Sequence, residues 1–281
     1  MKHRPVLLNE VIEGLNLKES GGQVVLDATF GGGGHSREIL FRYPGTKIIA
    51  IDEDEEVTAE KGISLHHENF RNLDKVLGDR KVDAILFDLG FSSDQLESSG
   101  RGFSFLKDEP LLMTMNEKAD LTAEVIVNNW SEENLADIIY GYGEERYARR
   151  IARAITEQRA KQPIKTTGEL VEVIQDAVPR KGKIHPATRT FQALRIAVND
   201  ELGALKEGLE KGFQALAPGG RLAVIAFHSL EDRIVKKFYI KKKEGGEATL
   251  INKKPITASN EEIKNNIRSR SAKLRIIKKI I

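Results

Sequence analysis

The sequence predicts an α/β fold with a mostly parallel sheet and an inserted all-helical domain. Short apolar runs that end in an acid alternate with helical segments before about residue 90, which is typical of βαβ units. From about residue 105 to 202 the apolar spacing becomes helical, and an apolar strand pattern returns at 221–227. We therefore expect a discontinuous α/β domain made of residues 1–104 and 203–281, with residues 105–202 forming the helical insertion.

The first strand and the turn after it indicate a site for an adenosine-containing ligand. Residues 24–26 are apolar, Asp27 follows them, and glycine occupies positions 31–34. Glycine allows backbone N–H groups to approach a ligand at dihedral angles that a Cβ would forbid. A second apolar run at 47–51 ends in Asp52. This order of strand, glycine turn, helix, strand and acid is typical of a unit whose acid binds ribose hydroxyls.

Two residues of this unit favour S-adenosylmethionine (SAM) over a nicotinamide dinucleotide. Dinucleotide sites have a third glycine where the helix packs on the strand, and here Ser36 occupies that place. Asp27 lies just before the turn, where a carboxylate would repel a pyrophosphate but would attract the ammonium group of SAM. A dinucleotide-dependent oxidoreductase is the alternative.

Further strands extend the predicted sheet. We expect residues 53–61 to form a crossover helix and residues 63–68 a third strand. A fourth strand at 82–87 ends in Asp88, so that acids follow three of the strands. Because ligands in open α/β sheets bind beyond the carboxyl ends of the strands, these acids should share one site. The two neighbouring histidines of the third strand face opposite sides and lack a third ligand nearby, so no metal site is expected.

The insertion is predicted to contain five helices. They are expected at residues 122–129, 132–140, 144–160, 167–178 and 189–211. The third of them places Arg149 and Arg153 on its polar face. Such arginines can contact RNA phosphates, or they can form ordinary ion pairs with Glu144 and Glu145.

A polar segment follows the returning strand and opens another helix. Ser229 and Asp232 are spaced to cap this helix, which leaves His228 and Arg233 to face the predicted site.

The C-terminal end is strongly basic. Residues 236–281 contain 14 Lys and Arg against 4 Asp and Glu, whereas the whole chain has a formal net charge of only +2. This distribution is typical of a phosphate-binding surface, although a solvated tail has the same composition. Strands are expected at 247–251 and 272–279, and residues 260–270 are expected to be only partly ordered.

The composition excludes several chemistries. The 281 residues include no cysteine, which excludes disulfides, thiolate zinc sites and a cysteine nucleophile. Methylation of a pyrimidine at carbon 5 through a cysteine adduct is therefore excluded, whereas an amine acceptor needs no such adduct. No apolar run approaches the ~18 residues of a membrane span, and the N-terminus lacks a signal peptide. We therefore expect a cytoplasmic protein without a membrane partner.

Seven segments resemble one family, in order along nearly the whole chain. They are Gly31–Ser36, Asp88–Gly90, Gly100–Phe105, Tyr142–Arg146, His185–Asn199, Phe227–Arg233 and Arg270–Arg275. On these segments the sequence resembles the bacterial 16S rRNA (cytosine-N4) methyltransferase family, RsmH or MraW. The resemblance implies a class I SAM-dependent methyltransferase (Rossmann-like, mostly parallel sheet) with a helical insertion for RNA recognition. It also implies methylation of the exocyclic N4 of one cytidine in the decoding centre of 16S rRNA.

The resemblance also implies roles for particular residues. The implied SAM contacts are Gly33, Gly34, His35, Asp52, Phe70, Asp88 and Gln95. The target amine becomes cationic as it reacts, so hydrogen-bond acceptors aimed at it stabilise the transition state. We expect Asp88, Ser92 and Ser93 to face the amine, with His228 near the base. The candidate RNA contacts are Arg149, Arg153, Arg189, Arg195 and Arg233. The expected partner is 16S rRNA in the small ribosomal subunit, with a homodimer as a further assembly and no metal.

Four positions depart from the family pattern. Leu112, Thr114 and Asn116 stand where the family has charged residues, and Asp94 stands where it has proline. The first three lie at the entry to the insertion, so the changes concern the substrate site more than the SAM site. They leave two alternatives: a methyltransferase for another nucleic acid or a protein, and an RNA-binding protein with a relict SAM site.

Overall fold

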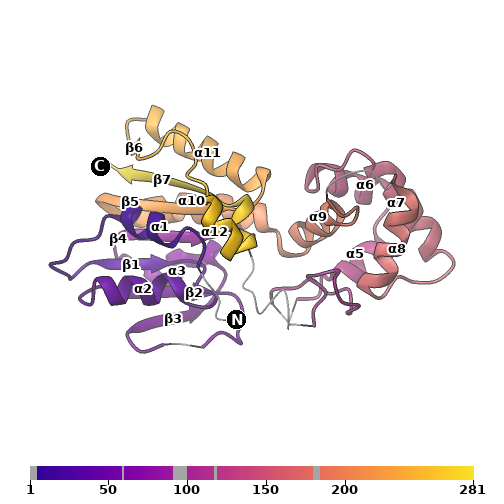
Figure 1. Cartoon of the computed structure of the whole chain (residues 1–281), viewed down its shortest axis with the longest axis horizontal. Helices are drawn as coiled ribbons and strands as arrows, with labels where there is room; N and C mark the ends of the chain where they lie inside the picture. Colours follow the sequence, from indigo (N-terminus) through magenta and orange to yellow (C-terminus); the bar gives the residue numbers. More distant parts are fainter. Residues whose placement is uncertain (1–4, 59, 91–99, 117–118, 180–183) are drawn as a thin grey trace. The chain divides into compact units, whose positions relative to one another are not determined.

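The computed structural model describes residues 5–58, 60–90, 100–116, 119–179 and 184–281 (Figure 1). The chain divides into two compact units. One consists of Met1–Gly90 with Leu202–Ile281, and the other consists of Phe91–Glu201. None of the described helices is long and apolar enough to cross a membrane.

The first unit is built on a mostly parallel sheet, as predicted. Its strands are β1 (Val24–Asp27), β2 (Lys47–Asp52), β3 (Ile63–His67), β4 (Val82–Asp88), β5 (Leu216–Ala226), β6 (Ala248–Leu250) and β7 (Lys273–Lys279). Within the described residues they form one seven-stranded sheet in the order β3-β2-β1-β4-β5-β7-β6. Strands β1 to β5 pair in parallel, whereas β7 is antiparallel to both β5 and β6. The carboxyl ends of β1, β2 and β4 therefore lie at one edge.

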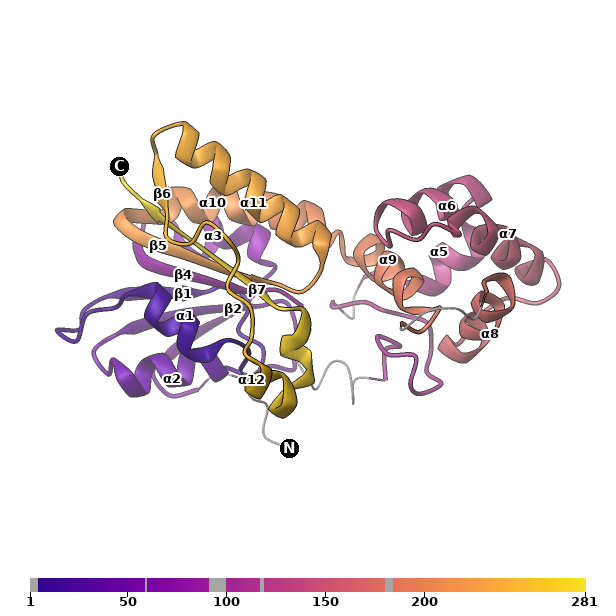
Figure 2. The same ribbon diagram turned by 45° about the horizontal axis from the view of Figure 1, so that its top comes forward.

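Helices cover both faces of this sheet. They are α1 (Leu8–Leu15), α2 (Gly34–Arg42), α3 (Leu73–Leu77), α10 (Glu201–Ala215) and α11 (Ser229–Glu244). Helices α1 and α2 lie on one side, and α3, α10 and α11 lie on the other (Figure 2). Side chains of a strand alternate between the faces, so Ile85 and Phe87 join one core while Ala84 and Leu86 join the other. Burial on both faces explains why these strands are continuous apolar runs.

Two local predictions for this unit are wrong. Among the described residues of 53–61 there is no helix, only turns. The carboxylates of Asp52 and Asp54 accept the N–H groups of residues 54 and 56, and such local bonds compete with a helix. The segment expected to be partly ordered forms α12 (Asn260–Asn265) and a 3₁₀ helix at Ile267–Ser271. The Ser259 side chain caps α12 by accepting from the Glu262 N–H.

The described part of the second unit contains five helices. Its helices are α5 (Ala123–Asn129), α6 (Glu132–Gly141), α7 (Ala148–Arg159), α8 (Thr167–Ala177) and α9 (Thr188–Asn199). The single helix expected at 189–211 is two helices, because Asp200 adopts a left-handed conformation with φ of 46° between α9 and α10. An uninterrupted helix requires right-handed dihedral angles at every residue.

Residues 100–116 pack with these helices although they form no helix themselves. Phe103, Leu111 and Met113 are buried in the same core as the five helices. These residues belong to the compact unit Phe91–Glu201 together with the five helices. Helical periodicity marks where the helices begin, and it does not detect an irregular segment that contributes to their core.

Substitution of Gly102 can be used to test how this irregular segment packs. Gly102 has φ of 72°, and a Cβ there would lie 2.4 Å from the Pro110 carbonyl oxygen. Gly100 has a similar φ of 65° with no atom within 4 Å of a Cβ. We expect Gly100→Ala to lower the free energy of unfolding by about 1–2 kcal/mol through backbone strain. Gly102→Ala should cost about 1–3 kcal/mol more because of the steric clash. Equal losses in chemical denaturation of the two variants would contradict this packing.

Candidate cofactor and active site

The glycine turn is fixed against the ends of two strands. After β1, the Phe30 N–H donates to the Ile51 carbonyl at 2.9 Å, and the Gly31 N–H donates to the Asp52 carboxylate at 2.6 Å. Gly31 and Gly33 have φ of 51° and 66°, in the region that favours glycine. Helix α2 begins directly after this turn. The predicted association of the glycine turn with Asp52 is therefore present.

Two of the glycines are also required by close packing. A Cβ on Gly33 would lie 2.6 Å from the Phe30 ring, and a Cβ on Gly34 would lie 2.3 Å from the Pro5 ring. The N-terminal segment therefore lies directly against the start of α2. The His35 Nε2–H donates to the Val6 carbonyl at 3.0 Å, which fixes the orientation of the buried imidazole.

Helix α12 holds the same N-terminal segment from its other side. The Leu7 N–H donates to Glu262 Oε1 at 2.8 Å, and Leu7 is buried with a left-handed φ of 52°. A left-handed leucine is strained and persists only where its surroundings compensate. The hydrogen bond that Glu262 accepts from Leu7 explains why residues 260–265 are ordered despite their polar composition.

A buried carboxyl group, Asp27, and a half-buried one, Asp88, lie at the carboxyl ends of β1 and β4. Asp27 is 2% exposed, and its Oδ2 accepts from the Ser36 hydroxyl at 2.6 Å. Burial raises the pKa of Asp27 to about 6, although the hydrogen bonds from Ser36 and Thr29 act in the opposite direction. Burial also raises the pKa of Asp88 well above its usual value, and repulsion from Asp27 and Glu231 adds to the effect. The surroundings of these two carboxyl groups therefore disfavour their ionised forms.

Asp88 has one oxygen that no described residue satisfies. Its Oδ2 lies 3.5 Å from His35 Nδ1, and its backbone N–H donates to the Thr29 hydroxyl at 2.6 Å. Its Oδ1 is buried without a hydrogen-bond partner among the described residues. Because buried polar atoms are nearly always paired, this oxygen indicates a place for a donor from a ligand.

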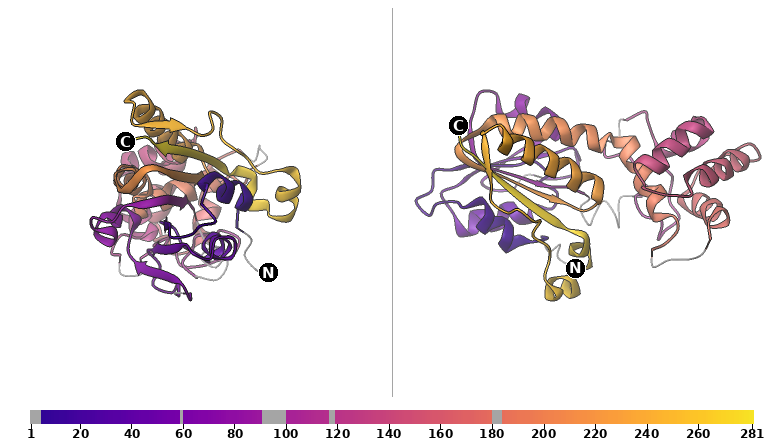
Figure 3. Two further views of the ribbon diagram at one scale, coloured as in Figure 1. Left: turned by 90° about the vertical axis from the view of Figure 1, so that its left-hand side faces the viewer. Right: turned by 90° about the horizontal axis from the view of Figure 1, so that it is seen from above.

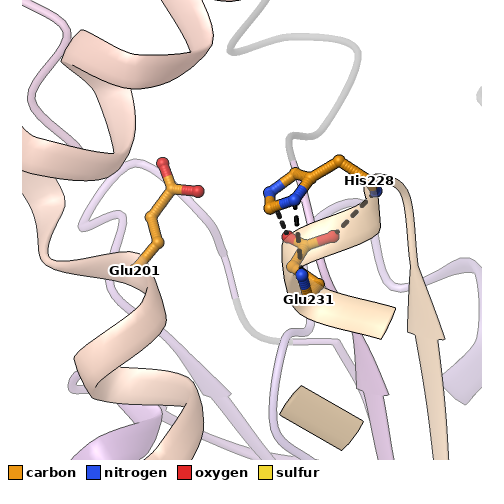
Figure 4. A group of neighbouring side chains, drawn as sticks. All are labelled: Glu201, His228 and Glu231. Atoms are coloured by element: carbon orange, nitrogen blue, oxygen red, sulfur yellow. Dashed lines mark hydrogen bonds and ion pairs between the residues drawn. The ribbon is translucent and has the colours of Figure 1, made fainter. Parts of the chain in front are cut away.

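His228 and Glu231 together cap helix α11 (Figure 4). His228 Nδ1 accepts from the Glu231 N–H at 3.4 Å, and Glu231 Oε2 accepts from the N–H groups of Phe227 and His228. His228 Nε2 lies 3.2 Å from Glu231 Oε1. The predicted cap by Ser229 and Asp232 is wrong. The N-cap residue is His228 and its partner is Glu231, each one position earlier in the sequence than predicted. His228 is therefore held at the start of α11 by Glu231, a buried residue beside the candidate site that the sequence analysis did not single out.

Asp232 is instead paired with the last strand. Its carboxylate accepts from Arg275 at 2.7 and 3.2 Å, and Lys273 lies 3.7 Å away. Both cations lower the pKa of Asp232, against the effect of its burial. This ion pair ties the start of α11 to β7, beside the carboxyl end of β5.

The predicted RNA contacts have different environments. Arg195 donates twice to the Glu201 carboxylate, at 2.7 and 2.9 Å, and its side chain is only 19% exposed. Arg189 lies 3.5 Å from Glu145, and Arg153 lies 3.7 Å from Glu132. Arg149 and Arg233 are exposed, on α7 and α11 respectively. Arg195 is thus engaged in an internal ion pair, whereas the others present their guanidinium groups to solvent to a larger extent.

Of the other predicted site residues, one is described by the structure and the rest are not. Phe70 is half-buried and packs edge-on against Phe87, with ring centroids 5.5 Å apart. Asp94, Gln95, Ser92 and Ser93 lie outside the described residues, so their predicted roles stay predictions.

The strand order identifies the class of protein. A sheet of order 3-2-1-4-5-7-6 with an antiparallel β7, and with a glycine turn after β1, is the arrangement of class I SAM-dependent methyltransferases. The chain matches the MraW methylase family over residues 1–280 and belongs to that family. The predicted class I methyltransferase fold with a mostly parallel sheet, the family and the SAM cofactor are thereby confirmed.

Curated relatives agree with this assignment. A protein of Synechococcus elongatus named ribosomal RNA small subunit methyltransferase H is 50% identical, and the match covers 99% of this chain and 95% of the relative. Proteins with the same name from Heliobacterium modesticaldum and Brevibacillus brevis are 46% and 45% identical, with 99% of this chain and 98% of each relative covered.

Asp27 should make the stability of the protein depend on pH. Its carboxyl keeps a proton up to pH about 6 in the folded protein, but loses it near its ordinary pKa of 3.8 in the unfolded chain. The stabilisation from Asp27 is therefore full below pH about 4 and is lost as the pH rises to about 6. Asp27→Asn keeps an acceptor for Ser36 and cannot ionise. Its free energy of unfolding should exceed that of the wild type by up to about 3 kcal/mol at pH 7, and by much less at pH 4.

The matched control for this prediction is the exposed Asp79→Asn. It should stay within about 0.5 kcal/mol of the wild type at both pH values. A pH-independent difference between Asp27→Asn and the wild type would contradict the assignment of a buried, protonated carboxyl.

Proposed function

We propose that this chain methylates the exocyclic N4 of a cytidine in the decoding centre of 16S rRNA. The names of the relatives support small-subunit ribosomal RNA as the substrate. The buried Oδ1 of Asp88, which has no hydrogen-bond partner among the described residues, carries the proposal for the acceptor, because an amino group can donate a hydrogen bond to it. The absence of cysteine from the sequence supports an acceptor that needs no covalent adduct.

The residues at the carboxyl edge of the sheet fit SAM. The left-handed glycines allow close approach to the backbone, and the Asp52 carboxylate lies beside the turn. Both Asp52 oxygens accept backbone N–H groups, which leaves about two lone pairs for ribose hydroxyls. When bound, SAM supplies an electrophilic methyl group on a sulfonium. We assign its contacts to Gly33, Gly34, His35, Asp52, Phe70 and Asp88, together with Gln95.

Asp88 is the group best suited to hold the amine and to accept its proton. The raised pKa of Asp88 makes its ionised form a stronger base than an ordinary carboxylate. The carboxyl ionises more readily beside a cationic cofactor, because an opposite charge lowers a pKa. His35, fixed by its bond to Val6, limits the positions that the Asp88 carboxylate can adopt. Ser92 and Ser93 follow Asp88 in the sequence and remain candidates for a second acceptor.

We propose that the helical unit recognises the RNA. Helix α7 and the residue just before its N-cap expose Arg146, Arg149, Arg150 and Arg153, at the i, i+3, i+4, i+7 spacing of one helix face. Arg149 and Arg150 form no ion pair with any described residue, which favours a phosphate partner. A ribosomal substrate is consistent with activity in the cytoplasm.

Substitutions at Asp88 and His228 test the proposed chemistry. Asp88→Asn should lower the single-turnover rate at saturating SAM about a hundredfold, because the variant cannot accept the proton. His228→Asn retains a good N-cap, whereas His228→Ala removes it. If His228 flanks the base, both variants should be slow; if it only caps α11, His228→Asn should be active. Mass spectrometry of 16S rRNA from treated small subunits should find one N4-methylcytidine.

The same assay separates the alternatives. Labelled SAM is supplied with small subunits, naked 16S rRNA, DNA or protein as the acceptor. Label in DNA or protein alone, or in a cytidine at a position other than N4, would contradict the proposal. No transfer to any acceptor would indicate a relict site.

A further inference from the structure

Helix α11 has an exposed face that is almost entirely basic. Val235, Tyr239 and the Lys242 side chain are buried toward the core. The exposed cations are Arg233, Lys236, Lys237, Lys241 and Lys243. At about 100° per residue they fall within an arc of about 160° on the solvent side of the helix. The only exposed acid in that arc is Glu244, at the last residue of the helix.

The acids around this face are already engaged elsewhere. Asp232 pairs with Arg275, and Glu231 accepts from backbone N–H groups. Glu210 and Glu247 both pair with the buried Lys242, at 2.9 and 3.2 Å. The remaining lysines of the face, at 236, 237, 241 and 243, form no ion pair with any described residue. No described residue therefore neutralises the positive charge of these four lysines.

Helix stability does not explain the whole face. Cations in the last turn are favoured by the helix dipole, which accounts for Lys241 and Lys243. Lys236 and Lys237 lie in the middle of the helix, where the dipole gives no benefit. None of the strongly exposed large apolar side chains of the described chain lies on α11. Ile240 lies within the arc but is half-buried, so the face offers little of the apolar surface that a membrane-bound helix inserts. A polyanion in water fits this surface better than a lipid bilayer.

The position of α11 connects this face to the candidate site. The helix follows β5 directly, and its cap residue Glu231 is close enough to Asp88 to raise the pKa of that carboxyl. From this end it extends for 16 residues, about 24 Å, alongside α10 (Figure 3). A chain bound along the face would therefore run from the edge of the sheet that holds the cofactor site.

We propose that the basic face of α11 binds the phosphate backbone of the RNA chain that flanks the target nucleotide. This inference rests on the proposed function and adds to it a surface of the α/β unit. Lysine contacts with phosphate are independent of base sequence and release counterions, so their removal weakens binding and lowers its salt dependence. The base contacts that select the target are left to other residues.

The test replaces Lys236, Lys237 and Lys241 together by glutamine. The control replaces Lys18, Lys47 and Lys75 by glutamine, since these exposed lysines belong to the same unit and lie outside α11. Binding of a 16S rRNA transcript is measured by fluorescence anisotropy at several salt concentrations. The α11 variant should bind about tenfold or more weakly, and its slope of log K against log salt should be shallower by about two to three. The control should bind within about twofold of the wild type.

Calorimetry of SAM binding tests whether the variants are folded, independently of RNA binding and of methyl transfer. Both triple variants should bind SAM as the wild type does, which shows that they are folded. An α11 variant with wild-type RNA affinity and slope, or a control that loses as much, would overturn the inference. The inference would also be overturned if the α11 variant lost binding to anionic lipid vesicles and kept wild-type binding to RNA. Weak RNA binding by the α11 variant, combined with a wild type that methylates no RNA, would refute the proposed function and still support the basic face.

Discussion

Placing carboxyl groups at the buried ends of adjacent parallel strands is the constraint on which the site depends. Ionised carboxylates are costly to bury unless they are paired or protonated. Here Ser36 donates to Asp27, and the pKa values of Asp27 and Asp88 are both raised, so these carboxyl groups hold their protons more tightly than usual. The helix that supplies Ser36 must start immediately after the glycine turn, so the geometry of the turn and the state of the acids are linked. A small hydroxyl at this position serves where a dinucleotide site would have glycine.

The same constraint explains why the N-terminal segment is held in place by several contacts. His35 can face Asp88 only if its other nitrogen is satisfied, and the Val6 carbonyl provides that partner. Val6 is kept in place by the strained Leu7, whose N–H is bound by Glu262 from α12. Residues from three distant parts of the sequence thus fix one imidazole. Polar atoms in such a network are interdependent, because a lost partner leaves a buried atom unsatisfied.

Much of this arrangement could be predicted because it is periodic. Apolar runs ending in Asp27, Asp52 and Asp88 were sufficient to predict three parallel strands and a shared edge. The failures occur where side chains compete with the local pattern. Asp54 replaces an expected helix by turns, and Asp200 divides an expected helix into two. The cap formed by His228 and the order of α12 depend on partners that no local pattern specifies, since Glu262 and Leu7 are 255 residues apart.

The electrostatics of the α/β unit follow from separating two tasks. A site for a cationic cofactor and an amine that becomes cationic requires negative charge, which would repel the phosphates of an RNA substrate. The acids at the strand ends contribute negative charge to the site once they ionise, as they do more readily beside a cationic cofactor, whereas the lysines exposed along α11 present the opposite sign to the solvent. At about 0.15 M salt, exposed charges are screened beyond about 8 Å, whereas buried ones are screened much less. In the reaction that we propose, both charges can therefore act on one substrate, the acids on the reacting amine and the surface cations on the backbone that carries it.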